Sequence, residues 1–175
     1  MLFLVAFGAL FVGGAVILLL ARYAPHPNAH LNLVARATPG GRAMGAEEFR
    51  ALVIDLLDAL KLEIVMEHAD GDGLDVVVRS SDPLTGGRFL VRGIWQVPGD
   101  VVDQPHVVRL AEHVRADGRA QKGILMTPWP ILTDGLGNLE APLELIDGRK
   151  LRELVEQHLD AKRLDQLAQY RGFGM

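Results

Sequence analysis

The chain has 175 residues, of which 49% are apolar, and it carries 22 acidic and 18 basic residues for a formal net charge of −4. This length and apolar content suit one globular domain with an appendage, and the acidic balance argues against a generally basic, nucleic-acid-coating surface. Because there is no cysteine, disulfides, thiolate zinc sites and cysteine nucleophiles are excluded.

The first long apolar run covers residues 2–21 and contains no charged residue and no proline. At about 1.5 Å rise per residue, a helix of this length crosses the hydrocarbon core of a bilayer. We therefore expect a transmembrane helix over residues 1–21. A cleaved signal peptide is the competing interpretation, but it calls for a basic segment before the run and a small-x-small cleavage site before Arg22, and neither is found.

Residues 22–43 are expected to form a juxtamembrane linker, because prolines, glycines and polar residues interrupt every helix or strand pattern there. Three arginines and no acidic residue lie between the apolar run and Glu47. The positive-inside rule then predicts a single-pass protein of the cytoplasmic membrane with its C-terminal domain in the cytoplasm. We expect this domain over residues 44–169, followed by a short tail at 170–175.

The domain is expected to open with one helix and three strands. Apolar residues at helical spacing predict a helix over residues 45–60. Runs rich in Val, Ile and Leu predict a short strand over 62–67 and two further strands over 74–79 and 88–97. Asp-Gly and Gly-Gly turns punctuate these runs, so the last two strands should form a hairpin.

The second half of the domain alternates between helix and strand patterns. A helix is expected over residues 104–116 with Asp103 as its N-cap, followed by a buried strand over 123–127. A helix followed by such a strand suggests an α/β crossover. A last strand is expected over 143–146, and a last helix from Asp147 to about Gln169. The buried side of the first of these helices should consist of Val107, Val108, Leu110, Ala111 and Val114.

The stretch from residue 127 to 138 is irregular, with clustered prolines and glycines around Trp129. Trp129 and Trp95 are the two tryptophans of the chain. They can either form an exposed contact surface or fill the core, and the core interpretation is favoured because large aromatic side chains are mostly buried.

Several pieces of the chain together resemble a known family. In order along the chain they read GAEEFRALVIDLLDALKLEIV, DGDGLDVVV, RFLVRGIWQ, VVRLAEHV, KGILMT and PLELIDGRKLRELV. Their order and spacing over residues 44–159 resemble the Mrr-type restriction endonuclease domain, a type IV enzyme domain of the PD-(D/E)xK nuclease superfamily. The resemblance implies an α/β fold, with a restriction endonuclease-like mixed β-sheet flanked by helices.

The resemblance also implies an active site, and this chain departs from it at three positions. The family binds a divalent metal with an acid after the Gly-x-Asp turn, and Asp75 keeps that acid. The family's Gln-x-Lys on the next strand is replaced here by Arg92 and Ile94, and the Glu that follows a Phe in its first helix is replaced by Arg50. Mg²⁺ is therefore expected only if activity survives, and no other cofactor is expected.

These substitutions change the chemistry that the site can perform. Side chains two apart on a strand share a face, so Arg92 and Ile94 should both point to the site beside Asp75. Arginine has no acceptor and cannot bind a metal, so we expect an ion pair of Arg92 with Asp75 in place of the metal and a vestigial site. Superfamily members can move the lysine to another element, which makes Lys61 and Lys122 candidate substitutes.

Three functions remain open at this level. The favoured one is a membrane-anchored, catalytically inactive domain that binds DNA or a protein partner. The alternatives are an active, Mg²⁺-dependent DNA endonuclease with a rearranged site, and a membrane-tethered protein-interaction domain without a nucleic-acid role. Three of the 18 basic residues lie before residue 44, so 15 basic residues follow it, together with all 22 acidic residues. This acidic excess weakens the DNA interpretation. A local basic patch of Arg50, Arg79, Arg88 and Arg92 is the feature that would support it.

Overall fold

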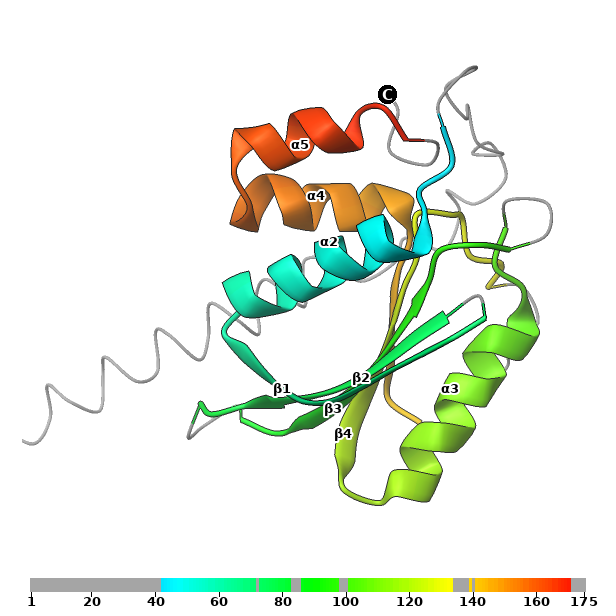
Figure 1. Ribbon diagram of the computed structural model, residues 1–175. Helices are drawn as coiled ribbons and strands as arrows, with labels where there is room; N and C mark the ends of the chain where they lie inside the picture. Colours follow the sequence, from blue (N-terminus) through cyan, green and yellow to red (C-terminus); the bar gives the residue numbers. More distant parts are fainter. Residues whose placement is uncertain are drawn as a thin grey trace, which may run out of the picture.

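The computed structural model describes residues 42–71, 73–82, 86–97, 101–133, 139 and 141–170. The expected transmembrane helix, nearly all of the linker and the tail after residue 170 lie outside these residues. Among the described helices, none is both long and apolar enough to span a bilayer. The elements, labelled as in Figure 1, are α2 (Ala46–Ala59), β1 (Leu62–Asp70), β2 (Gly73–Ser80), β3 (Arg88–Ile94), α3 (Gln104–Asp117), β4 (Ala120–Met126), β5 (Leu143–Ile146), α4 (Gly148–His158) and α5 (Ala161–Leu167).

The strands form one five-stranded mixed sheet in the order β1-β2-β3-β4-β5. β1, β2 and β3 are antiparallel neighbours, whereas β3, β4 and β5 run parallel to one another. The parallel step from β3 to β4 passes through α3, which confirms the expected α/β crossover. Figure 1 shows α2, α4 and α5 stacked on one face of the sheet and α3 alone on the other.

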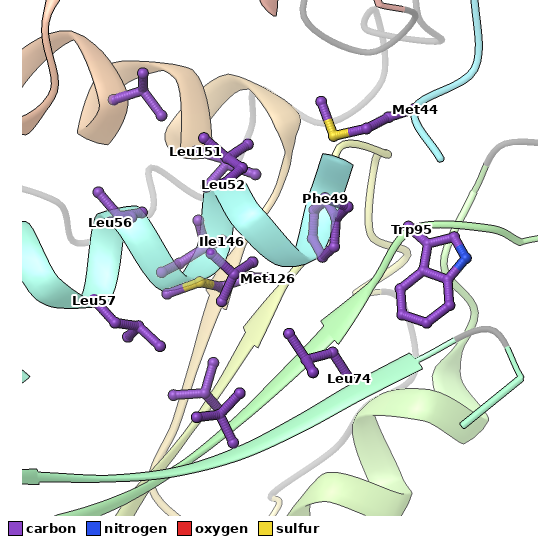
Figure 2. Close-up of a cluster of buried hydrophobic side chains, with 14 of the residues drawn as sticks. Met44, Phe49, Leu52, Leu56, Leu57, Leu74, Trp95, Met126, Ile146 and Leu151 are labelled. Carbon is purple, nitrogen blue, oxygen red and sulfur yellow. The ribbon is translucent and has the colours of Figure 1, made fainter. Parts of the chain in front are cut away.

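The larger core lies under α2 and α4. The predicted apolar stripe of α2 is buried from Phe49 to Leu57 and partly buried at Leu60. Phe49, in the first turn of the helix, lies close to Trp95 (Figure 2). Gly93 of β3 makes this packing possible, because a Cβ there would lie 2.8 Å from Phe49 Cε1. The other members of this cluster with less than 2% exposure are Leu52, Leu56, Leu57, Leu74, Val76, Met126 and Leu151, with Val53, Val78 and Val155.

A second, smaller core lies between the sheet and α3. Val107, Leu110, Ala111 and Val114 form the buried stripe of α3, as predicted. Val108 was predicted to join this stripe, but it is 37% exposed and that prediction is wrong. The reason is geometric: at 3.6 residues per turn, the residue after Val107 is rotated about 100° away from the sheet.

Several predicted strand ends shift in the structure. β1 runs on to Asp70 instead of ending at residue 67, because its pairing with β2 continues up to the Asp70–Gly73 pair beside the turn. β3 ends at Ile94, and β4 begins at Ala120, three residues earlier than predicted. The longer β1 makes the acidic turn part of a three-stranded antiparallel unit.

The single C-terminal helix expected from Asp147 is two helices. Asp147 caps α4 as predicted, accepting a hydrogen bond from the Lys150 amide at 2.9 Å. α4 ends at His158, and Asp160 then caps α5 by accepting from the Arg163 amide at 2.9 Å. The Asp160 side chain caps a new helix N-terminus instead of letting α4 continue, which accounts for the break after His158.

Both tryptophans are buried, which confirms the core interpretation. Trp95 is 8% exposed and Trp129 is 5% exposed. The indole Nε1 of Trp129 donates to the Trp95 carbonyl at 3.0 Å. The irregular stretch after β4 is thereby fixed to the chain that leaves β3.

Candidate active site

The centre of the candidate site is a cross-strand pair at one end of the sheet. Asp75 of β2 lies directly opposite Arg92 of β3. Arg92 Nη1 donates to Asp75 Oδ2 at 2.6 Å, and Arg92 Nη2 lies 3.7 Å from Asp70 Oδ1. The Arg92 side chain is 3% exposed, whereas the Asp75 and Asp70 side chains are 36% and 54% exposed. The expected Asp75–Arg92 ion pair is therefore present, with the cation buried beneath two solvent-facing carboxylates.

The turn between β1 and β2 makes room for the guanidinium. A Cβ on Gly73 would lie 2.7 Å from Arg92 Nη2 and 3.0 Å from Arg92 Cζ. Gly71, in the turn that follows Asp70, adopts a left-handed conformation with φ 38°, which glycine accepts without strain. The Gly-rich turn thus packs against an arginine and places a second carboxylate beside it.

Two comparisons with known proteins bear on this site. A family model described as a restriction endonuclease, of the Mrr catalytic type, matches residues 42–155. The chain belongs to this restriction endonuclease family.

Two solved structures are also similar to the chain. One is the DNA modification-dependent restriction endonuclease AspBHI, with 12% sequence identity, coverage of 71% of this chain and 38% of that chain, and a TM-score of 0.42. The other is the MspJI restriction endonuclease in complex with a 27-mer oligonucleotide, with 16% identity, coverage of 71% and 28%, and a TM-score of 0.38. The matched region thus spans less than two fifths of either structure. No curated protein matches the chain.

The residues around Asp75 do not fit the divalent metal that a restriction endonuclease domain typically uses. Such an ion takes oxygen ligands, whereas the group held closest to Asp75 is a permanently charged donor without an acceptor. Among the residues that the structure describes, no three His, Asp or Glu side chains are grouped so as to hold a metal. A guanidinium therefore supplies the positive charge at this position.

A β-bulge removes one further carboxylate from the site. The pairing of β1 with β2 shifts register between Ile64 and Met66. Without this shift Glu67 would lie opposite Asp75 and share its face, whereas in the structure Glu67 lies opposite Val76 and His68 opposite Asp75. The bulge thus turns Glu67 to the α2 face of the sheet.

Arg50 meets Glu67 on that other face. Arg50 Nη2 donates to Glu67 Oε2 at 3.0 Å, and Arg50 Nε donates to Glu67 Oε1. The hydrogen bond to Glu67 raises the pKa of Arg50 above its ordinary value. Of the substituted family positions, the structure therefore brings Arg92 to Asp75 but leaves Arg50 on the opposite side of the sheet.

Ile94 lies on the face of β3 that the sequence predicted, two residues beyond Arg92 and opposite Gly73. It shares the face of Arg92, but it is fully buried in the second core cluster, which also contains Trp129 and Leu125. Its side chain therefore packs with apolar residues on the side of the sheet that carries Asp75 and Arg92.

Neither candidate substitute lysine approaches Asp75. Lys122 Nζ donates to Glu144 Oε2 at 3.1 Å, and Lys150 of α4 bonds the other oxygen of Glu144 at 2.6 Å. This group lies on the α4 face, away from Asp75. Lys61 precedes Leu62, which pairs with Ser80, so at about 3.3 Å per residue it is roughly 20 Å from Asp75 along the sheet.

The suggested patch of four arginines is not formed. Arg79 and Arg88 lie opposite each other at the far end of the hairpin, about 13 Å along the strand from Arg92. Arg88 Nε donates to Asp117 Oδ2 at 3.2 Å. Arg50 lies on the other face, so these cations are separated and three of them are in ion pairs.

One feature near the site was missed from the sequence. A groove of about 520 Å³ runs from Asp75 to Asp117 between the exposed face of β1–β2 and the side of α3. Mainly apolar side chains line it, among them Met66, Val77, Leu90 and Leu110, with His68 and His113. In the sequence, the groove is indicated only by the alternation of Met66 and His68 with Glu67. The bulge decides which face of the sheet these residues point to, so the alternation alone does not predict the groove.

Proposed function

We propose that this restriction endonuclease domain is catalytically inactive and acts as a binding domain held at the cytoplasmic face of a membrane. The observation that carries the proposal is the Asp75–Arg92 pair, with the guanidinium at 2.6 Å from the carboxylate that the family uses for metal. Hydrolysis of a phosphodiester in this family requires a hard cation that activates water and neutralises developing charge. Here a buried guanidinium is already paired with Asp75 and Asp70, so the Asp75 carboxylate does not bind a catalytic metal.

The charges of the domain favour a protein over DNA as the bound partner. DNA binding is driven by cations that are free to neutralise phosphates. Here most basic side chains lie within ion-pair distance of a carboxylate of the same domain. These pairs are Arg42–Glu48, Arg50–Glu67, Arg88–Asp117, Arg92–Asp75, Lys122–Glu144, Lys150–Glu144, Arg149–Glu153, Arg152–Glu156 and Arg163–Asp55.

A cleavage assay tests the loss of activity. The full chain in detergent, and a soluble protein from Arg42 onward, would be incubated with methylated and unmethylated plasmid in Mg²⁺ or Mn²⁺. We expect no nicking or linearisation above a buffer blank. Cleavage by the parent protein that disappears in Asp75→Ala would refute the proposal and assign a working metal site to Asp75.

A binding assay tests the choice of partner class. Non-specific protein–DNA complexes have a Kd of roughly 10⁻⁴–10⁻⁶ M at physiological salt. We expect the domain to bind a fluorescent DNA duplex more weakly than this range, as measured by anisotropy at low and at physiological salt. A micromolar Kd that rises steeply with salt would instead select the DNA version of the proposal.

The membrane anchor is tested separately. The apolar run at residues 2–21 motivates it, with the three arginines that follow. We expect the full chain to sediment with membranes after a carbonate wash, and a chain without residues 2–21 to remain in the supernatant. Release of the full chain by carbonate would remove the anchor from the proposal.

A further inference from the structure

The sheet has a face that its own helices cover only in part. On the side opposite α2 and α4, α3 packs mainly against β4 and β3, and no other described helix lies on that face (Figure 1). The β1–β2 part of this face therefore forms the floor of the groove beside α3. Sheets with helices on both faces normally bury both faces, so this layer is incomplete.

The uncovered part has the dimensions of one further helix. Neighbouring strands lie about 4.8 Å apart, so β1 and β2 lie roughly 10 Å from the strands beneath α3. Packed helices lie 8–10 Å apart, which is the same spacing. A helix laid beside α3 would thus contact β1–β2 below it and the side of α3 that carries Leu110, His113 and Asp117.

Exposure and charge point to the character of this helix. Met66 is 57% exposed on the groove floor, although its neighbours Val77 and Leu110 are 5% and 2% exposed. Asp75 and Asp117 stand at the two ends of the groove, where Arg88, which also lines it, already pairs with Asp117 at 3.2 Å. Asp70, beside Asp75, is 54% exposed. Asp75 and Asp70 share the single guanidinium of Arg92, which is buried, so this end of the groove carries one more negative than positive charge.

We propose that the groove between α3 and β1–β2 binds an amphipathic helix of a partner protein, with an apolar stripe on Met66, Val77 and Leu90 and basic side chains toward Asp70 and Asp75. Helix-in-groove recognition uses apolar anchors at i, i+3, i+4 and i+7, which this floor can receive. The inference deepens the proposed function, on which it rests, by giving the chemistry of the partner.

The experiment uses a model helix as the probe. The full chain in zwitterionic phosphatidylcholine nanodiscs would be titrated into a labelled peptide of about 18 residues, long enough to form a helix, with Leu at the anchor positions and Lys elsewhere. Empty nanodiscs give the lipid blank. We expect micromolar binding, weakened by salt, and no comparable binding of the same peptide with Glu in place of Lys.

Two pairs of variants place the binding in the groove. Met66→Thr should weaken binding roughly fivefold or more, because it removes an apolar contact, while Leu132→Thr changes an equally exposed apolar residue outside the groove. Ala116→Arg should abolish binding by filling the groove with a cation, while Glu112→Arg places the same side chain on an exposed position of α3 that does not line it.

Several outcomes would overturn the inference. The first three are no binding of the Lys peptide, binding of the Glu peptide equal to that of the Lys peptide, and an equal loss of binding in the control variants. The other two are displacement of the peptide by duplex DNA, and loss of peptide binding when the chain associates with itself. None of these concerns cleavage, so failure here leaves the inactive-domain proposal standing. Plasmid cleavage that depends on Asp75 would refute that proposal whatever the peptide does.

Discussion

The guanidinium of Arg92 is almost fully buried, whereas the carboxylates around it face solvent. Removal of Asp75 leaves this cation with Asp70 alone, at 3.7 Å. Breaking a fully buried pair costs about 3–5 kcal/mol, and because Asp75 is partly exposed we expect Asp75→Ala to lower the free energy of unfolding by about 2 kcal/mol. Urea denaturation at pH 7 measures this loss.

The matched double variant separates the buried charge from the lost contact. In Asp75→Ala with Arg92→Met, the unpaired cation is gone, so most of the lost stability should return. Glu112→Ala removes an exposed acid from α3 and should change the urea midpoint little. A double variant that is less stable than Asp75→Ala alone would show that the guanidinium stabilises the fold by packing rather than by pairing.

Substitution of Ile94 tests whether this buried position accepts a charged side chain. Its side chain is fully buried among apolar residues. Ile94→Lys buries an ammonium without a partner, so we expect a loss of at least about 3 kcal/mol in urea, against about 1 kcal/mol for Ile94→Val. Stability of Ile94→Lys close to that of the parent chain would mean that the lysine reaches solvent or Asp75.

The antiparallel and crossover elements follow from sequence patterns with physical causes. The apolar periodicity predicts α2, and the turn residues around Gly87 predict the β2–β3 hairpin. Asp75 and Arg92 lie opposite each other in that hairpin, as expected. The bulge after Ile64 carries no comparable signal, and it alone decides that Glu67 turns away from Asp75. The position of α3 over β3–β4 depends on packing between distant segments, so the groove could not be predicted.

The C-terminal elements are joined by an ion-pair group whose effect depends on pH. Burial of Glu144 by itself raises its pKa, but the hydrogen bonds and charges of Lys150 and Lys122 outweigh burial, so the pKa of Glu144 lies below its ordinary value. A carboxyl whose pKa is lowered by folding stabilises the fold above its unfolded pKa, near 4.3. That contribution is lost as the pH falls through the lower folded value.

Glu144→Gln should reveal this contribution. We expect the variant to be less stable than the parent chain at pH 7, and the difference between their urea midpoints to shrink as the pH is lowered from about 4.5 toward 3. Glu112→Gln, which changes an exposed acid without these lysines, controls for net charge. A difference that is constant over this pH range would assign the effect of Glu144 to packing.

The contacts of the domain include residues on both sides of the expected boundaries. The domain was expected over residues 44–169, but Arg42 and Tyr170 form a parallel bridge, and the Arg42 amide donates to the Gln169 carbonyl at 3.1 Å. Arg42 Nη2 also donates to Tyr170 Oη at 2.8 Å, and the Tyr170 hydroxyl donates to Glu48 Oε1 at 2.9 Å. Such contacts join segments that are far apart in the sequence, so local sequence patterns do not predict them.

This clamp lies where the N-terminal segment enters the domain, so it tests the boundary directly. A protein that begins at Met44 lacks the bridge to Tyr170 and the Arg42–Glu48 ion pair, whereas one that begins at Arg42 keeps both. We expect the shorter protein to have the lower urea midpoint at an unchanged m-value. Arg42→Ala in the longer protein should fall between them, because it keeps the backbone hydrogen bond to Gln169 and loses the side-chain contacts. Equal midpoints for the two proteins would place the start of the stable domain at α2, and any pull from a membrane anchor would then act directly on that helix.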